Sequence, residues 1–217
     1  MRTNPHLRTE PVRSGTRDLE QASLVVYAVH GRGQQPQFMA DVAHRIEKPD
    51  TAYLLPGADG NSWYPRSFLA PLEDNEPSIG HALETVDTHL SWIASQGVPT
   101  ERTVLLGFSQ GACLLAEYLL RTGHRCGGAA LLTGGYLGPE EKSWAALGHS
   151  FDGMPVLLAT SARDEWVPLP RVHATTEAFA ELGASVRLHV DDDPDHHIND
   201  DVLVYTRELF DTITTRR

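Results

Sequence analysis

The chain has 217 residues, of which 41% are hydrophobic and 22% charged, a balance typical of one globular domain. Its formal net charge of −11 argues against nucleic acid or an anionic membrane surface as the main partner. No run approaches the ~18 apolar residues of a membrane-spanning helix, and residues 1–22 lack the apolar core of a signal peptide. We therefore expect a polar N-terminal leader over 1–22, one folded domain over 23–217 and a cytoplasmic location.

Short apolar runs alternate along the chain with stretches of helical periodicity. Continuous apolar runs, typical of strands covered on both faces, predict strands over 24–30, 52–56, 103–108, 127–133, 156–160 and 185–190. Apolar residues at helical spacing predict helices over 36–47, 79–93, 110–122, 168–183 and 202–213.

This alternation predicts an α/β fold in which helices cover both faces of a mostly parallel central sheet. Ligands of such sheets bind at the carboxyl ends of the strands. Residues 57–77 are too many for an ordinary connection, so we consider them a candidate functional loop. A shorter irregular stretch, 136–153, is expected to hold a brief helix.

The strongest functional signal lies where the third predicted strand meets the helix that follows it. Residues 107–111 read G-F-S-Q-G, directly after the strand and at the start of the helix. In that setting G-x-S-x-G is the signature of a nucleophile elbow, a sharp turn that exposes the serine hydroxyl. The turn requires small neighbours, which Gly107, Gly111 and Ala112 provide. Ser109 is therefore the predicted nucleophile.

A serine becomes a good nucleophile only when a base removes its proton, and that base needs an orienting carboxylate. In this type of fold the acid and then the histidine follow the serine, each after a later strand. The loop after the fifth predicted strand offers Asp164 and Glu165, and the loop after the sixth offers His196 and His197. The order of these residues fits a catalytic triad.

Four motifs in register resemble the phospholipase/carboxylesterase family, which includes the acyl-protein thioesterases. They read V-H-G-R-G-Q after the first strand, then G-F-S-Q-G-A, R-D-E-W-V-P and H-H-I, and the resemblance spans about residues 23–213. It implies a single-domain α/β-hydrolase that cleaves carboxylic esters or thioesters without metal or cofactor. Between the strands we see no insertion long enough for a large cap domain.

Matching the motifs by position assigns a role to each member of the triad. The resemblance makes Ser109 the nucleophile and Asp164 the acid, since Asp164 rather than Glu165 stands in a D-x-x-V-P pattern. The family's histidine stands two residues before an Ile or Val, which selects His196 over His197.

The oxyanion that forms on the substrate carbonyl needs two N–H donors aimed at it. We expect one from the backbone of Gln110 and one from the backbone of Arg32, whose flanking glycines let the main chain approach the site. Many relatives have an apolar residue at position 32 and an Asp where this chain has Gln34. The Arg32 side chain therefore has two interpretations: it binds an acidic group of the substrate, or it points to solvent or pairs with a local carboxylate.

Aromatic residues around the predicted triad suggest a substrate pocket. Trp63 matches a family aromatic on the 57–77 loop, and Phe68 adds apolar surface to that loop. We expect the loop to form one wall of an acyl pocket, with Trp166 at the opposite rim; the alternative is that these side chains fold the loop onto the core.

Metal and cofactor binding are not expected. Residues 191–197 hold four Asp and two His, but the run shows no defined ligand geometry and is expected to be a solvated acidic segment. No phosphate-binding glycine motif is present, and Cys113 and Cys126 lack disulfide or metal spacing.

We therefore predict a serine hydrolase that cleaves esters or thioesters of short- to medium-chain acyl groups through an acyl-enzyme. A lactone or dienelactone-type hydrolase shares the fold, although such enzymes often use cysteine as the nucleophile. A non-catalytic ligand-binding module on the same scaffold is a further alternative, against which the complete triad argues. The expected partner is a small-molecule substrate, without nucleic acid or integral membrane association, and the sequence leaves a homodimer open.

Overall fold

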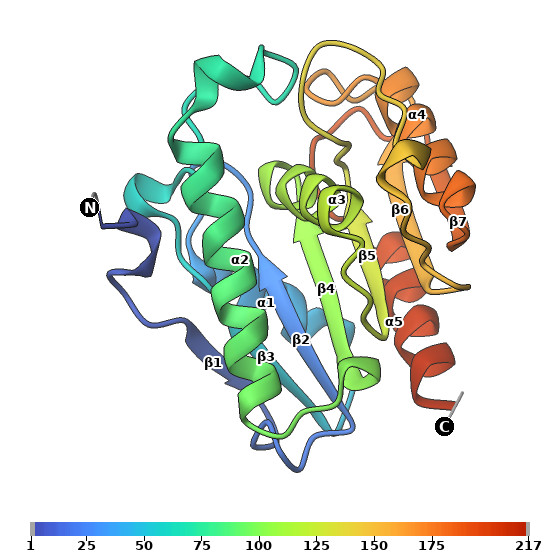
Figure 1. The fold of residues 1–217 in the computed structure, drawn as a ribbon. Helices are drawn as coiled ribbons and strands as arrows, with labels where there is room; N and C mark the ends of the chain where they lie inside the picture. The colour runs from blue at the N-terminus through green and yellow to red at the C-terminus, as the bar shows by residue number, and fades with distance from the viewer. Residues whose placement is uncertain (1–2, 216–217) are drawn as a thin grey trace.

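A computed structural model describes residues 3–215 and shows one seven-stranded sheet (Figure 1). The strand order is β1-β3-β2-β4-β5-β6-β7, and every neighbouring pair is parallel except β1 with β3. The strands are β1 (Val12–Gly15), β2 (Leu24–Val29), β3 (Thr51–Leu55), β4 (Thr103–Phe108), β5 (Gly128–Leu132), β6 (Pro155–Ser161) and β7 (Ser185–Asp191).

Helices cover both faces of the sheet. They are α1 (Pro36–Ile46), α2 (Ser78–Ser95), α3 (Gln110–Thr122), α4 (Leu169–Glu181) and α5 (Asp200–Thr215). Helices α2, α3 and α4 share one apolar core with their face of the sheet, and α1 and α5 share a second core on the other face (Figure 1). Strands β2, β4 and β5 are fully buried, as their continuous apolar sequences require.

These elements confirm the α/β fold predicted from the sequence. The six predicted strands and five predicted helices lie within about two residues of their expected positions. The 57–77 loop contains only two short 3₁₀ turns, η2 (Asp59–Asn61) and η3 (Leu72–Asn75), and the 136–153 stretch holds the brief helix η5 (Ala145–Leu147).

The N-terminal segment contains structure that the sequence pattern did not indicate. Strand β1 pairs antiparallel with β3 at the edge of the sheet, after the short turn η1 (Pro5–Leu7). The Asn4 amide donates to the His81 carbonyl of α2 at 2.7 Å, and the buried His6 ring packs against Trp63. The division of the chain at residue 22 stays a prediction.

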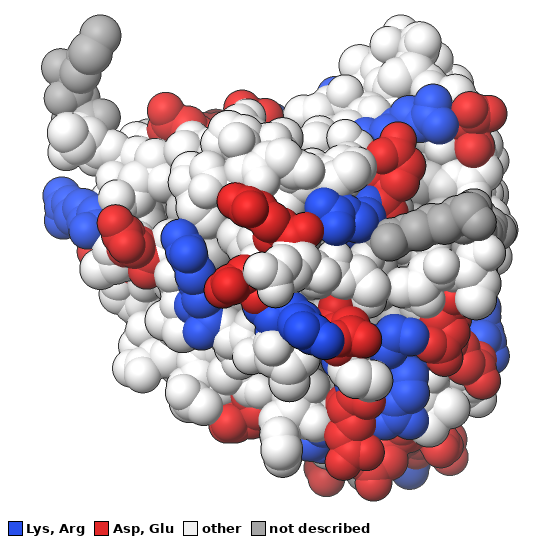
Figure 2. All heavy atoms as spheres, turned by 90° about the horizontal axis from the view of Figure 1, so that it is seen from below, with Lys and Arg blue, Asp and Glu red and all other residues white. Residues whose placement is uncertain are grey.

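The parallel register places the segments that follow β2 to β7 at one edge of the sheet. Val29 is level with Gly107, Phe108 with Leu132, and Ser161 with Asp191, so the strands end together. The segments that hold the predicted site residues all leave from this edge. Figure 2 shows the molecule from the opposite end, where acidic and basic side chains are interspersed.

Between residues 3 and 215, no helix has both the length and the apolar character needed to cross a membrane.

Candidate active site

The turn between β4 and α3 has the backbone of a nucleophile elbow. Ser109 has φ 53° and ψ −119°, a region that non-glycine residues rarely occupy and that is stored as strain. The turn is held by the Ser109 N–H, which donates to the Leu132 carbonyl at 2.9 Å. A Cβ at Gly107 would come within 2.7 Å of the Ala112 backbone, and one at Gly111 would overlap the carbonyl oxygen of Val29. The predicted need for small residues is therefore met.

Three side chains from distant parts of the sequence meet at the carboxyl edge of the sheet. The His196 Nε2 atom lies 2.8 Å from Ser109 Oγ, and its Nδ1 atom lies 2.6 Å from Asp164 Oδ2. Both distances are within hydrogen-bond range, so a continuous path runs from hydroxyl to imidazole to carboxylate. These are the three side chains that the sequence motifs singled out.

The Asp164 carboxylate is fixed from both sides. Its side chain is almost fully buried, and its second oxygen, Oδ1, accepts from the backbone N–H groups of Trp166 and Val167 at 2.8 Å each. Glu165 is exposed and has no place in this arrangement. The turn after β6 thus aims Asp164, and not its neighbour, at the imidazole.

The two adjacent histidines lie in different environments. The His196 ring is half-buried and packs against the rings of Phe108 and Trp166. His197 is exposed, and its Nε2 lies 2.6 Å from Asp193 Oδ2. Hydrogen bonds from the Asp195 N–H and from His197 lower the pKa of Asp193 below its ordinary value.

The acidic residues before His196 form hydrogen bonds that stabilise the loop in which they lie. The Ser161 hydroxyl donates to the Asp193 carbonyl, the Asp193 N–H donates to Asp191 Oδ1 at 3.1 Å, and the Asn199 amide donates to Asp191 Oδ2 at 2.6 Å. In the portion of the chain that the structure covers, no three His, Cys, Asp or Glu side chains gather as metal ligands would.

The two residues predicted to supply the oxyanion N–H groups, Gln110 and Arg32, line the same cavity as Ser109. The Gln110 N–H is the first of helix α3 and lies at the positive end of its dipole. The Arg32 N–H belongs to the loop after β2, which is braced where the Gly31 N–H donates to Gln34 Oε1 at 2.8 Å. Neither the Gln110 nor the Arg32 N–H donates to another group within 3–215.

His30, at the start of this loop, is buried and held as a neutral ring. Its Nδ1 is the donor to the Gly31 carbonyl at 2.7 Å, and its Nε2 accepts from the Ala58 N–H at 3.2 Å. Burial lowers the pKa of His30, which favours this neutral form. The loop geometry therefore depends on an uncharged histidine.

The Gln110 side chain has a role that sequence analysis missed. It is buried, and its Oε1 accepts from the Trp63 N–H at 2.9 Å while its Nε2 donates to the Tyr64 carbonyl at 2.8 Å. The residue after Ser109 thus ties the 57–77 loop to helix α3. The only sequence signal was a polar side chain inside an otherwise apolar helix start.

A cavity of about 490 Å³ opens beside Ser109 and His196. Phe68 and Trp166 line it, as predicted, and Trp166 is 72% exposed at its rim. Trp63 does not line it, which corrects the prediction. Its indole is fully buried beneath the loop, with Nε1 donating to the His30 carbonyl at 2.9 Å, and the next residue, Tyr64, faces the cavity instead.

The Arg32 side chain forms no ion pair with a carboxylate among residues 3–215; the interpretation that it binds an acidic group of the substrate stays a prediction. Its guanidinium donates to the carbonyl of Pro65 at 2.8 Å and also to that of Arg66, on the cavity wall. It also lies over the Tyr64 ring, 5.8 Å from the centroid. Arg32 thereby fastens the loop after β2 to the loop after β3.

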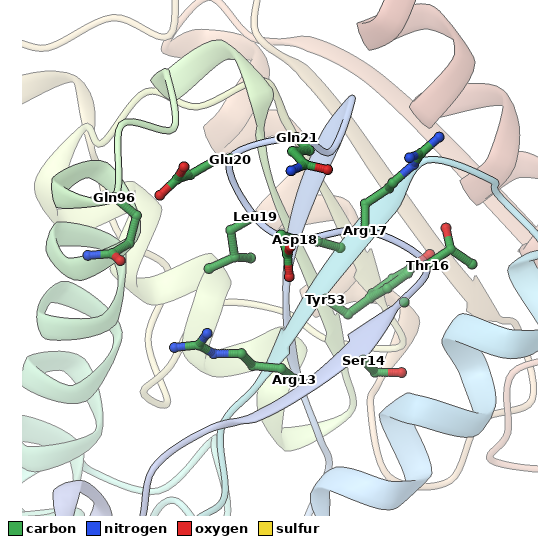
Figure 3. A pocket seen from close by; sticks show the side chains of 12 residues that line it. Arg13, Ser14, Thr16, Arg17, Asp18, Leu19, Glu20, Gln21, Tyr53 and Gln96 are labelled. Carbon is green, nitrogen blue, oxygen red and sulfur yellow. The ribbon is translucent and has the colours of Figure 1, made fainter.

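Two other cavities are lined by different residues and do not include Ser109. A neighbouring cavity of about 300 Å³ is lined by Phe38, Phe108 and Ile198, and it touches His196 but not Ser109. A cavity of about 560 Å³ lies at the amino-terminal edge of the sheet, between residues 13–21, Tyr53 and Gln96 (Figure 3). It contains none of the predicted site residues, so its size does not make it the reaction site.

Comparisons with known proteins identify relatives of this chain. A family model described as phospholipase/carboxylesterase matches residues 16–212. The sequence is 26% identical over 190 residues to esterase YpfH of Escherichia coli, covering 82% of this chain and 78% of that protein. It is 27% identical over 227 residues to acyl-protein thioesterase 1 of Eremothecium gossypii, covering 94% of each.

The fold has a solved counterpart with detectable sequence similarity. A crystal structure of a phospholipase/carboxylesterase from Dyadobacter fermentans matches with a TM-score of 0.87 and 31% identity, over 93% of this chain and 95% of that one. The family model spans most of the chain, and the relatives are esterases and thioesterases. The family predicted from the four motifs is therefore confirmed. This chain is a hydrolase of the carboxylesterase class and belongs to the phospholipase/carboxylesterase family of α/β-hydrolases.

Proposed function

We propose that this enzyme hydrolyses carboxylic esters or thioesters of short- to medium-chain acyl groups through an acyl-enzyme on Ser109. The observation that carries the proposal is the hydrogen-bonded path from Ser109 Oγ through His196 to Asp164, at 2.8 and 2.6 Å. Such a path lets imidazole accept the serine proton while the carboxylate fixes the tautomer.

The reaction proceeds in two halves. Ser109 Oγ attacks the carbonyl carbon as His196 Nε2 takes its proton, and the N–H groups of Arg32 and Gln110 stabilise the oxyanion. The bond to the leaving group then breaks, and His196 returns its proton to the departing oxygen or sulfur. Water next attacks the acyl-enzyme, giving a proton to His196; the carboxylic acid leaves and Ser109 regains its hydrogen.

The size of the site supports the proposed acyl length. A cavity of about 490 Å³ lies in the lower half of the ~300–1,000 Å³ range of small-molecule sites. Its walls include the apolar side chains Phe68, Trp166 and Val167. This space suits a short or medium acyl chain.

The test is the substitution Ser109→Ala, assayed on a 4-nitrophenyl ester. We expect kcat to fall by ~10⁴ to 10⁶, because the nucleophile and its proton transfer are removed together. Covalent labelling by a fluorophosphonate should disappear from the same variant. The matched control is Ser95→Ala, an exposed serine of α2, which should keep both properties. Turnover and labelling that survive Ser109→Ala would refute the proposal.

A further inference from the structure

The cavity beside Ser109 has an unusual charge for this protein. Arg32 and Arg66 both line it, and within residues 3–215 its lining contains no Asp or Glu. The chain as a whole has a formal charge of −11. A locally cationic cavity in an acidic protein favours a ligand that carries negative charge.

The positive charge of Arg32 is held in place but not neutralised. Its two hydrogen-bond acceptors are the carbonyls of Pro65 and Arg66, which are neutral, and no ion pair of Arg32 with a carboxylate occurs in the described chain. By contrast, Arg187 pairs with Glu208 at 2.6 Å and Arg45 with Asp200 at 2.8 Å. A guanidinium has five N–H donors, of which the two hydrogen bonds of Arg32 use two.

The anchoring also makes Arg32 a suitable anion receptor. The contacts with the loop and with the Tyr64 ring restrict the side chain before any substrate arrives, which reduces the entropy lost on binding. The planar fork of a fixed guanidinium matches the two oxygens of a carboxylate. The remaining wall is apolar at Phe68, Val167 and Trp166, which suits an alkyl spacer.

The position of the cavity decides which half of the substrate carries the charge. The 490 Å³ cavity is lined by His196 and also by Ser109, Arg32 and Gln110, the residues assigned to the nucleophile and the oxyanion donors. The 300 Å³ cavity shares His196, the group assigned to protonate the leaving group, but includes neither Ser109 nor the oxyanion donors. Because the acyl carbon would be bonded to Ser109, this arrangement favours the cationic cavity as the acyl site.

We propose that the acyl group of the natural substrate ends in a carboxylate, which Arg32 binds: the substrate is a half-ester or half-thioester of a short dicarboxylic acid. The inference rests on the proposed function, because it assumes acyl transfer to Ser109. It goes beyond that function by naming the charge and the position of the recognised group.

The experiment compares two acyl groups of equal length. Wild-type enzyme is assayed on 4-nitrophenyl hydrogen adipate and 4-nitrophenyl hexanoate, with uncatalysed hydrolysis subtracted, and the ratio of the two kcat/KM values is recorded. The ratio is measured again in Arg32→Leu and in Arg125→Leu, an exposed arginine that pairs with Asp152 away from the cavity. A second arm compares 4-acetoxybenzoate with its methyl ester, which places the charge on the leaving group.

We expect wild type to prefer the adipate at least tenfold, Arg32→Leu to lose most of that preference, and Arg125→Leu to keep it. Added salt should also reduce the preference, since the interaction is between charges near the surface.

Equal rates on the two acyl groups, or a ratio unchanged by Arg32→Leu, would overturn the inference but leave the proposed function standing. A preference seen only in the 4-acetoxybenzoate arm would overturn the acyl assignment. Failure to hydrolyse any ester would instead remove the proposed function.

Discussion

Asp164 and Glu165 are adjacent and carry the same charge, yet they lie in different surroundings. Asp164 accepts two backbone hydrogen bonds through Oδ1 and presents Oδ2 to His196, while Glu165 is exposed. The D-x-x-V-P pattern anticipated this choice, because its spacing supplies the N–H groups that hold the carboxylate.

The substitution Asp164→Asn tests whether the carboxylate is needed for the reaction, because it removes the charge but keeps the shape of the side chain. An amide keeps the shape but no longer holds the imidazole with a proton on Nδ1, so we expect kcat to fall by ~10⁴. Glu165→Gln removes the same charge one residue away and should change kcat by less than about twofold, since exposed surface charges contribute little. The measurement is steady-state hydrolysis of a 4-nitrophenyl ester. Equal losses in the two variants would show that the acid has been misassigned.

At the scale of elements, local sequence patterns identified most of the sheet but missed one strand. The central strands are continuous apolar runs because helices cover both of their faces, and such runs stand out in a sequence. Strand β1 reads V-R-S-G, is largely exposed, and forms only because β3 offers an unpaired edge. Because β1 forms through its pairing with β3, its own sequence shows no apolar pattern that would predict a strand.

The candidate site was predictable to a similar extent, and for the same reason. The elbow, the acid and the histidine each lie in a short motif after a strand, so their convergence follows from the topology. Which of Trp63 and Tyr64 faces the cavity, and where Arg32 points, depend on how loops from different strands pack. Those contacts are tertiary and have no local signature.

The contact between Gln110 and the loop after β3 leads to a prediction about substrate binding. In Gln110→Glu, an oxygen replaces the Nε2 donor and faces the Tyr64 carbonyl, so the loop should move away from α3. Because this loop forms a cavity wall, we expect KM for a 4-nitrophenyl ester to rise several-fold, and by a larger factor than kcat falls.

The matched control for this prediction is Gln96→Glu, at the end of α2 and far from the elbow. It should leave both constants near their wild-type values. If Gln110→Glu lowered kcat alone and left KM unchanged, the side chain would act on the reaction itself rather than on the wall.

At the scale of the whole molecule, several buried or half-buried histidines link folding to pH. His6, His30, His89 and His124 all have pKa values lowered by burial, in the case of His89 to about 4. His89 lies on the buried face of α2, where its Nδ1 atom is 3.0 Å from the Tyr27 hydroxyl. Each of these rings is therefore neutral in the folded protein over a range in which an unfolded chain would charge it.

The consequence is a loss of stability on the acid side. A histidine with an ordinary pKa of ~6.5 in the unfolded chain binds a proton before the folded protein does, so the unfolded state gains protons as pH falls. The free energy of unfolding should therefore decrease from about pH 6.5 down to about 4, the folded value for His89. Thermal melts at intervals across that range measure how the free energy of unfolding depends on pH.

The variant His89→Gln, which cannot titrate, should lose less stability as the pH falls. The control is His173→Gln, a substitution of an exposed histidine of α4, which should follow wild type. If His89→Gln melted with the same pH dependence as wild type, burial of this ring would not be a source of the acid sensitivity.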